Sequence, residues 1–287
     1  MTWLNAVNDQ VAGIGAVVVP GTLRDSLFIL DTILTLDGGP RPEMVATDTA
    51  SYSDIVFGLF RLLGYRFSPR IADLADQRFW RADPIGGPPG DYGALNAIAR
   101  HKVNVEKIRA HWPDMLRVTG SLLTNTVRSY DLIRMLAHDG NPTSLGQAFA
   151  EYGRIAKTLH LLAMVDPIDT SYRRTVHRQL TVQESRHRLA RKIFHGQRGE
   201  LRQAYREGQE DALGALGLAL NAVVLWNTRY IDAAVTQLRA DGHPVLDEDV
   251  ARLSPLGDAH INMLGRYPFT PRPDRTLRAL RDPNAAL

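Results

Sequence analysis

The segment from Met44 to Arg70, MVATDTASYSDIVFGLFRLLGYRFSPR, constrains the fold most strongly, because it places an acid between an apolar strand and an apolar helix. The run Met44–Ala46 predicts a short strand, and the Thr-Asp-Thr turn that follows carries Asp48. From Ser53 onward, apolar residues recur at helical spacing, at positions 55, 59, 62 and 63. An acid held at a strand end suits metal-dependent phosphoryl chemistry. Asp and Thr are also ordinary helix-capping residues, so a capping or turn role for Asp48 stays open.

The residues before and after this segment extend the pattern into a layered α/β fold. Pro20-Gly21 ends one expected strand, and Asp37-Gly38-Gly39-Pro40 ends one expected helix. The order β-β-α-β-α-β is typical of an α/β domain. We expect strands at 3–7, 16–19, 44–48 and 65–68, with helices at 23–36 and 53–63.

From Ala72 onward the strand signal fades and the chain becomes helical. The stretch Asp83–Gly93, DPIGGPPGDYG, is too rich in glycine and proline for a regular element and predicts a loop. Helical spacing then predicts helices at 103–111, 115–123, 127–136 and 145–165. This order fits a helical insertion into an α/β domain, and a separate helical domain is the alternative.

Composition narrows the chemistry. The chain of 287 residues has no cysteine, which excludes disulfides, zinc–thiolate sites and thiol nucleophiles, so a bound metal must use oxygen or imidazole ligands. No uninterrupted apolar run reaches the length of about 18 residues that a membrane span needs, and MTWLNAVNDQ lacks the order of a signal peptide. We expect a cytoplasmic protein with no membrane partner.

Positive charge is concentrated between Arg173 and Arg206. Ten Lys or Arg residues lie in this segment against two acids, Glu184 and Glu200, although the formal net charge of the whole chain is only +3. A run of this bias is typical of segments that follow a phosphate backbone. A solvated basic helix face is the alternative.

Glu184 is the acid of interest in the basic segment. We expect it in the first turn of a helix that buries Leu189 and its neighbours, with Arg188 and Arg191 on the same side as the acid. A carboxylate among cations could hold a divalent metal beside a phosphate. The letters Thr181-Val-Gln-Glu184 also match a capping box, which leaves a structural role open. Three rival acids are predicted to be helix N-terminal charges: Glu207, Glu210 and Asp211. Asp54, in the first turn of the helix that begins near Ser53, is predicted to be a solvated or capping acid.

Several blocks together carry a family resemblance. In order, they are VVVPGTLRDS, TDTASYSDIVFGLFRLLGYRFSPRIADL, GRIAKTLHLLAMVD, RHRLARKIFHGQRGE, LGALGLALNAVVLWNTRYIDAA, LSPLGDAHINMLGRYPF and LRALRD. From about Gly15 to Asp282 the chain resembles the C-terminal part of Tn3-family transposases. The resemblance implies an RNase H-like catalytic core interrupted by a helical insertion. It also implies an Asp-Asp-Glu triad that binds two divalent ions, Mg²⁺ or Mn²⁺.

The resemblance assigns residues and boundaries. The second Asp of the triad corresponds to Asp48 and the Glu to Glu184, which would be catalytic and metal-binding residues. The implied domains are a partial RNase H-like α/β core at 1–72, a helical insertion at 73–170, and the remaining core helices with a helical C-terminal region at 171–287. The residues expected to contact DNA are Arg173, Arg174, Arg186, Arg188, Arg191, Lys192 and Arg198.

The function implied by the resemblance is DNA transposition. The family's reaction is metal-dependent strand cleavage and strand transfer at transposon ends, with end and target DNA as partners, a homodimer as the full-length enzyme, and the bacterial cytoplasm as its location. One departure matters: the family's first Asp belongs on a strand ahead of the hairpin, and this chain begins with what resembles the second strand. We therefore expect a C-terminal piece that does not cleave transposon ends by itself with Mg²⁺ or Mn²⁺. The alternatives are an inactive remnant that binds DNA or dimerises, and an unrelated helical interaction protein.

Overall fold

The structure divides into two compact units. The computed structural model describes residues 2–19, 25–36, 38, 41–49, 52–194, 207–262, 265, 266, 277 and 280. The first unit comprises Met1–Ala6 with Ile14–Val182, and the second comprises Val7–Gly13 with Gln183–Leu287. Asp48 belongs to the first unit and Glu184 to the second.

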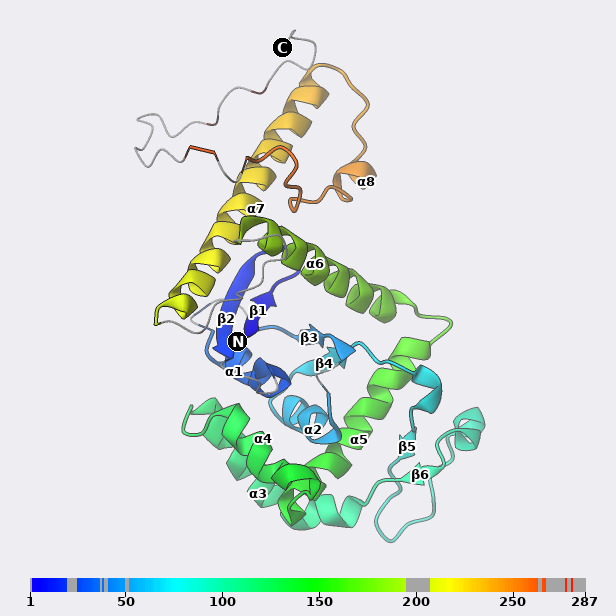
Figure 1. The fold of residues 1–287 in the computed structure, drawn as a ribbon. Helices are drawn as coiled ribbons and strands as arrows, with labels where there is room; N and C mark the ends of the chain where they lie inside the picture. The colour runs from blue at the N-terminus through cyan, green and yellow to red at the C-terminus, as the bar shows by residue number, and fades with distance from the viewer. Residues whose placement is uncertain are drawn as a thin grey trace. The chain divides into compact units, whose positions relative to one another are not determined.

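The first unit opens with the predicted order of strands and helices (Figure 1). The 3-10 turn η1 leads directly into α1, so the helix expected at 23–36 is shorter than predicted where it is described. The elements are β1 (Thr2–Val7), β2 (Gly13–Val19), η1 (Asp25–Phe28), α1 (Ile29–Leu34), β3 (Met44–Thr47), α2 (Asp54–Leu62) and β4 (Arg66–Pro69). Mixed α/β structure is confirmed. The described strands form two-stranded sheets, β1 with β2 and β3 with β4.

β3 and β4 are parallel, and α2 makes the connection between them. Val45 pairs with Phe67 and Thr47 with Pro69. Val45, Thr47 and Phe67 are buried, because alternate residues of a strand point to the same face. A parallel pair needs a crossover of this kind, and the helix supplies it. The carboxyl end of β3, which Asp48 follows directly, is therefore held in place by residues packed in the core.

The region after residue 72 is helical, with two differences from prediction. Two-residue strands that sequence reasoning missed, β5 (Trp80–Arg81) and β6 (His101–Lys102), pair in parallel. The helices predicted at 103–111 and 115–123 are one helix, α3 (Val105–Leu123), which continues through Pro113. Its apolar side is buried at Met115 and Leu122, and this packing outweighs the hydrogen bond that the proline cannot donate. The other elements are η3 (Leu74–Asp76), η4 (Gly93–Ala97), α4 (Ser129–Ala137), η5 (His138–Gly140) and α5 (Ser144–Val165).

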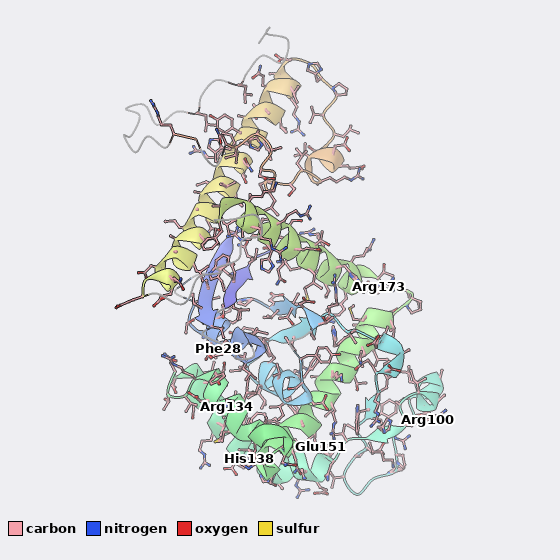
Figure 2. The ribbon with its side chains drawn as sticks, in the orientation of Figure 1. Phe28, Arg100, Arg134, His138, Glu151 and Arg173 are labelled. Carbon is pink, nitrogen blue, oxygen red and sulfur yellow. The ribbon has the colours of Figure 1, made fainter. Side chains whose placement is uncertain are left out.

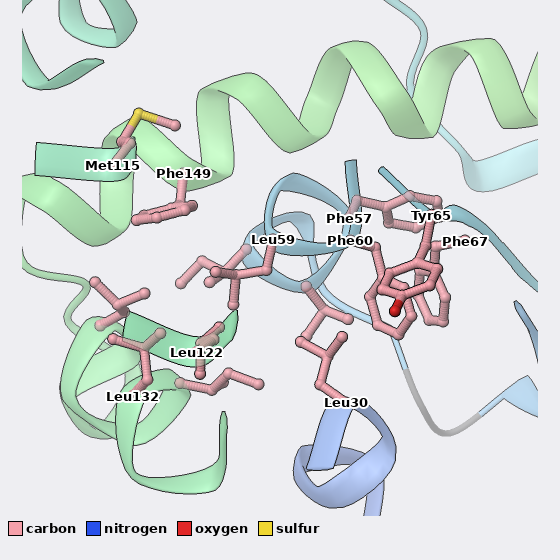
Figure 3. Packing of buried hydrophobic residues seen from close by; sticks show 14 of the residues in the cluster. Leu30, Phe57, Leu59, Phe60, Tyr65, Phe67, Met115, Leu122, Leu132 and Phe149 are labelled. Carbon is pink, nitrogen blue, oxygen red and sulfur yellow. The ribbon is translucent and has the colours of Figure 1, made fainter. Parts of the chain in front are cut away.

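Helices α2 and α5 cross at backbone contact. A Cβ added at Gly153 would lie 1.7 Å from the Asp54 carbonyl oxygen, and one added at Gly58 would lie 2.4 Å from the Phe149 carbonyl oxygen. Figure 3 shows Phe149 of α5 beside Leu59 of α2 in the same apolar cluster. The cluster joins side chains of α1, α2, β3, β4, α3, α4 and α5. Helices α3, α4 and α5 therefore share one core with the α/β elements.

The C-terminal helices follow the same chain order. α6 (Ser171–Ile193) passes from the first unit into the second, and α7 (Gln209–Ala240) and α8 (Asp247–Val250) lie in the second. Glu210 and Asp211 lie in the first turn of α7, as predicted. Among the helices described, α7 is long and apolar enough to cross a membrane by length and composition alone, a test that core helices of soluble proteins also pass.

Candidate functional site

Asp48 follows the last residue of β3 and is exposed. One carboxylate oxygen, Oδ1, accepts hydrogen bonds from the Thr49 amide at 2.6 Å and from the Thr49 hydroxyl at 3.2 Å. The strand behind it is fixed by Val45 and Thr47, which are buried against the core. The carboxyl ends of parallel strands are common ligand positions in α/β proteins. The acid is thus presented to solvent from a rigid element.

Asp54, the rival acid of this region, has a structural role. It lies in the first turn of α2, where Ser53 caps the helix by accepting from the Val56 amide at 3.3 Å. Its carboxylate pairs with Arg154 at 3.2 Å and with Lys157 at 3.7 Å, both on α5. These ion pairs hold α2 to α5.

Glu184 lies in the middle of α6, so the expected position in the first turn of a helix is wrong, and so is the capping-box alternative. The helix begins ten residues before Thr181, whose hydroxyl donates to the His177 carbonyl oxygen at 2.9 Å, as in a helix interior. Glu184 is exposed and makes no hydrogen bond or ion pair with any residue that the structure describes. Helical spacing places Arg188 and Arg191 on the same side. The described geometry therefore gives this carboxylate no structural partner.

Most of the predicted DNA-contacting cations of α6 are exposed. Figure 2 shows Arg173 near the start of the helix. Arg198 lies outside the described residues, so the structure gives no position for it. The exposed members are Arg173, Arg174, Arg188, Arg191 and Lys192.

Arg186 has a packing role that sequence reasoning missed. Its side chain is 1% exposed, and its guanidinium donates to the Val11 carbonyl oxygen at 3.0 Å and to Asn221 Oδ1 at 2.6 Å. Asn221 also accepts from the Gly13 amide at 2.9 Å and donates to the Gly13 carbonyl oxygen at 2.9 Å. Burial lowers the pKa of the guanidinium. Arg186 thereby ties α6 and α7 to the turn after β1 within the second unit.

A buried polar chain fixes the first turn of α6. His160 Nε2 donates to the Pro69 carbonyl oxygen at 3.1 Å, and His160 Nδ1 accepts from the Tyr172 hydroxyl at 2.8 Å. Ser68 donates to the same tyrosine oxygen at 2.5 Å. Arg66 lies over the Tyr172 ring at 3.8 Å. Burial lowers the pKa of His160 to about 4, so the imidazole is neutral at pH 7.

No sequence signal pointed to this chain of side chains, because its members come from β4, α5 and α6.

The described residues contain no preassembled metal cluster: within them, no three His, Asp or Glu side chains gather closely enough to hold an ion.

Comparison with known proteins gives a family match over most of the chain. The profile of the Tn3 transposase DDE domain matches residues 1–267. The chain is 58% identical over 285 residues to the transposase for transposon Tn4556 of Streptomyces fradiae, covering 99% of this chain and 31% of that protein. It is 50% identical over 270 residues to the transposase for transposon gamma-delta of Escherichia coli strain K12, covering 94% of this chain and 26% of that protein.

A third relative extends the similarity to more distant sequences. The transposase for transposon Tn21 of Escherichia coli is 38% identical over 268 residues, covering 93% of this chain and 26% of that protein. The chain thus spans less than a third of the length of these relatives, and the similarity runs through nearly all of it. With a profile match that includes both Asp48 and Glu184, the chain belongs to the Tn3 transposase DDE domain family.

Proposed function

We propose that this chain takes part in phosphoryl transfer on transposon DNA, with Asp48 and Glu184 as metal-binding carboxylates. The observation that carries the proposal is the family match over residues 1–267, which includes both acids. The geometry supports it, because both carboxylates are exposed and Glu184 is neither a helix cap nor an ion-pair partner among the described residues.

The donor atoms suit a hard divalent cation. One oxygen of Asp48 is occupied by hydrogen bonds from Thr49, which leaves the other oxygen for a cation. Carboxylate oxygens are the ligands that Mg²⁺ and Mn²⁺ prefer. When bound, such ions activate a water or a DNA 3′-hydroxyl and stabilise the charge that develops on the scissile phosphate. The resemblance also implies a third carboxylate, for which we assign no residue of this chain.

The chain's own residues would position and bind the DNA. β3 positions Asp48, because its residues Val45 and Thr47 are buried in the core. Tyr172, through its hydrogen bond to His160, fixes the start of α6, the helix that carries Glu184. Arg188 and Arg191, four and seven residues after Glu184, would hold phosphates next to that acid. Contacts of this kind give affinity with little reading of base sequence.

The same proposal includes an RNase H-like core. The order β1-β2-α1-β3-α2-β4 is consistent with it, and residues 73–170 would form the insertion between β4 and α6. The shared apolar cluster adds a physical detail, because α5 of that insertion would complete the core of the α/β elements.

Metal binding is tested by calorimetric titration of the chain with Mn²⁺. We expect Asp48→Asn and Glu184→Gln each to weaken binding, because each removes a charged oxygen ligand, and we expect Asp241→Asn, at an exposed acid after α7, to leave it unchanged. Binding that survives both substitutions would reject the assignment. The readout is metal binding and not DNA cleavage, because we expect the chain alone not to cleave transposon ends.

DNA binding is tested by the salt dependence of affinity for a duplex. Each phosphate contact contributes about 0.9 to the slope of log K against log salt, so the double variant Arg188→Gln/Arg191→Gln should lower the slope by about 2. Arg239→Gln is the control, because Arg239 is engaged by Asp247 at the end of α7. An unchanged slope in the double variant would exclude these two residues from the interface.

A further inference from the structure

The carboxyl edge of the β3–β4 sheet carries an arginine beside Asp48. β3 and β4 are parallel, so both strands end at the same edge (Figure 1). Thr47 pairs with Pro69, and the amide of Arg70 donates to the Thr47 carbonyl oxygen at 2.8 Å, which extends the pairing by one residue. Neighbouring strands lie about 4.8 Å apart, so the backbones of Asp48 and Arg70, the next residue on each strand, lie side by side.

Asp48 and Arg70 belong to the same face of this sheet. Alternate residues of a strand share a face, which groups Asp48 with Ala46 and Arg70 with Ser68. Ala46 and Ser68 are themselves partners in the register. The other face carries the residues of β3 and β4 that pack in the apolar cluster.

Tyr172 of α6 covers this face as far as Ser68. The serine is buried, and its hydroxyl oxygen lies 2.5 Å from that of Tyr172. Arg66, two residues before the serine, lies over the tyrosine ring at 3.8 Å. Two residues after the serine, Arg70 is exposed, and so is Asp48 on the neighbouring strand. The cover therefore ends where the two charged residues begin.

The opposite charges of Asp48 and Arg70 are not paired with each other. The carboxylate is oriented by Thr49, which donates to Oδ1 through its amide and its hydroxyl. The guanidinium of Arg70 makes no hydrogen bond or ion pair with any residue that the structure describes. Arg66, by contrast, is engaged by an aromatic ring. Arg70 therefore has donors available for a ligand at this edge.

This pair of side chains has the chemistry of a site for a metal-bound phosphate. The carboxylate offers an oxygen to a divalent cation, and the guanidinium offers a planar fork of N–H donors that matches two phosphate oxygens. An arginine side chain is longer than an aspartate side chain, so its charged end can reach past the carboxylate. An anion bound to the metal would lie within that reach.

We propose that Arg70 binds the DNA phosphate that the metal at Asp48 engages. This inference rests on the proposed function, from which it takes the metal at Asp48. The guanidinium would offset negative charge on that phosphate, which lowers the electrostatic cost of bringing a nucleophile to it. Arg70 would thus act at the metal itself, because it belongs to the same sheet edge as the ligand.

The first test is calorimetric titration of the free chain with Mn²⁺. Arg70→Gln should tighten Mn²⁺ binding by about threefold to tenfold, because it removes a positive charge that lies close to the divalent ion. This effect has the opposite sign to the one expected for Asp48→Asn. A variant that merely folds poorly would bind Mn²⁺ more weakly, so lost structure does not imitate the expected result.

The second test is the affinity for a DNA duplex at saturating Mn²⁺, measured over a series of salt concentrations. Arg70→Gln should raise the dissociation constant by about tenfold, because a hydrogen bond between two charged groups is lost. It should also lower the slope of log K against log salt by about 1, the share of one phosphate contact.

Two further variants make the result specific. Arg61→Gln is the matched control: Arg61 is an exposed arginine in the last turn of α2, which leads into the amino end of β4 at the opposite edge of the sheet. Both measurements should keep their wild-type values in this variant. Arg70→Lys should keep the wild-type Mn²⁺ affinity, because the charge remains, and only part of the duplex affinity, because an ammonium lacks the planar fork.

The outcomes separate this inference from the function on which it rests. Mn²⁺ binding that is indifferent to Asp48→Asn would reject the metal site, and the inference with it. If Asp48→Asn weakens Mn²⁺ binding but Arg70→Gln leaves it unchanged, the inference alone is overturned, since Arg70 would then lie away from the metal. An unchanged duplex affinity in Arg70→Gln would overturn it as well.

Discussion

Burial of His160 makes the stability of the first unit depend on pH. The imidazole is 4% exposed, and its pKa is about 4 in the folded chain against an ordinary value of 6.5. Burial is the main cause, and the nearby charges of Arg66 and Lys157 add to it, while the hydrogen bond to Pro69 opposes it. At 1.36 kcal/mol for each pH unit, this difference corresponds to about 3 kcal/mol.

The sign follows from proton uptake. The unfolded chain binds a proton at this residue as the pH falls below 6.5, whereas the folded chain binds it only near pH 4. The stabilisation is therefore complete above pH 6.5 and is lost as the pH falls from 6.5 to 4. Between about pH 7.5 and about pH 4.5, the loss from this residue is about 2.5 kcal/mol.

The measurement is the free energy of unfolding by urea for the wild-type chain and for His160→Gln at both pH values. Other groups titrate equally in the two proteins, so the advantage of the wild type over the variant should shrink by about 2.5 kcal/mol on acidification. Tyr172→Phe is the control, since it removes one hydrogen bond, worth about 1 kcal/mol, but keeps the buried imidazole and its pH dependence. An advantage that stays constant or grows at low pH would refute the reasoning.

Four further substitutions test the packing. Gly153→Ala should lower the free energy of unfolding by about 1–3 kcal/mol or more, because the added Cβ would clash with the backbone of α2. Gly120→Ala, in open space within α3, should raise it by up to about 1 kcal/mol. Thermal unfolding that ranks the two variants in the opposite order would exclude a tight crossing of α2 and α5. Asp31→Ala should cost about 1–2 kcal/mol, because Asp31 accepts from the Ser129 and Tyr130 amides at the start of α4, at 2.7 and 3.2 Å; unchanged hydrogen exchange at those amides would contradict this. Arg186→Ala should unfold the turn at residues 7–13, because the Val11 carbonyl oxygen and Asn221 Oδ1 both lose the guanidinium that donates to them. Protease resistance of this turn equal to that of the wild type would disprove the prediction.

Local pattern was sufficient for the α/β part of the fold. The strand before Asp48 and the helix after Ser53 were predicted from apolar spacing over short stretches of sequence, and the structure confirms both. The bounds of α5 were predicted within one residue for the same reason. These elements are decided by neighbours in sequence.

The misses share a different cause, which is packing between distant residues. The sequence at Thr181 matches a capping box, but the helix starts ten residues earlier, because packing buries its residues Val176 and Leu180. From charge composition, Arg186 was predicted to contact DNA like its neighbours, because its buried partner Asn221 lies 35 residues further along the chain. Whether Asp48 and Glu184 act on one phosphate stays a prediction.

The backbone crossing of α2 and α5 has a consequence during synthesis. Gly58 and Gly153 are 95 residues apart, so at a translation rate of about 5–20 residues per second α2 exists for about 5–20 s before its partner is made. During that interval Phe57 and Phe60, which end up within the core, have no α5 to cover them. The nascent chain therefore passes through a state with an exposed apolar helix, and this is the stage at which chaperones would bind it and at which slow synthesis would promote aggregation.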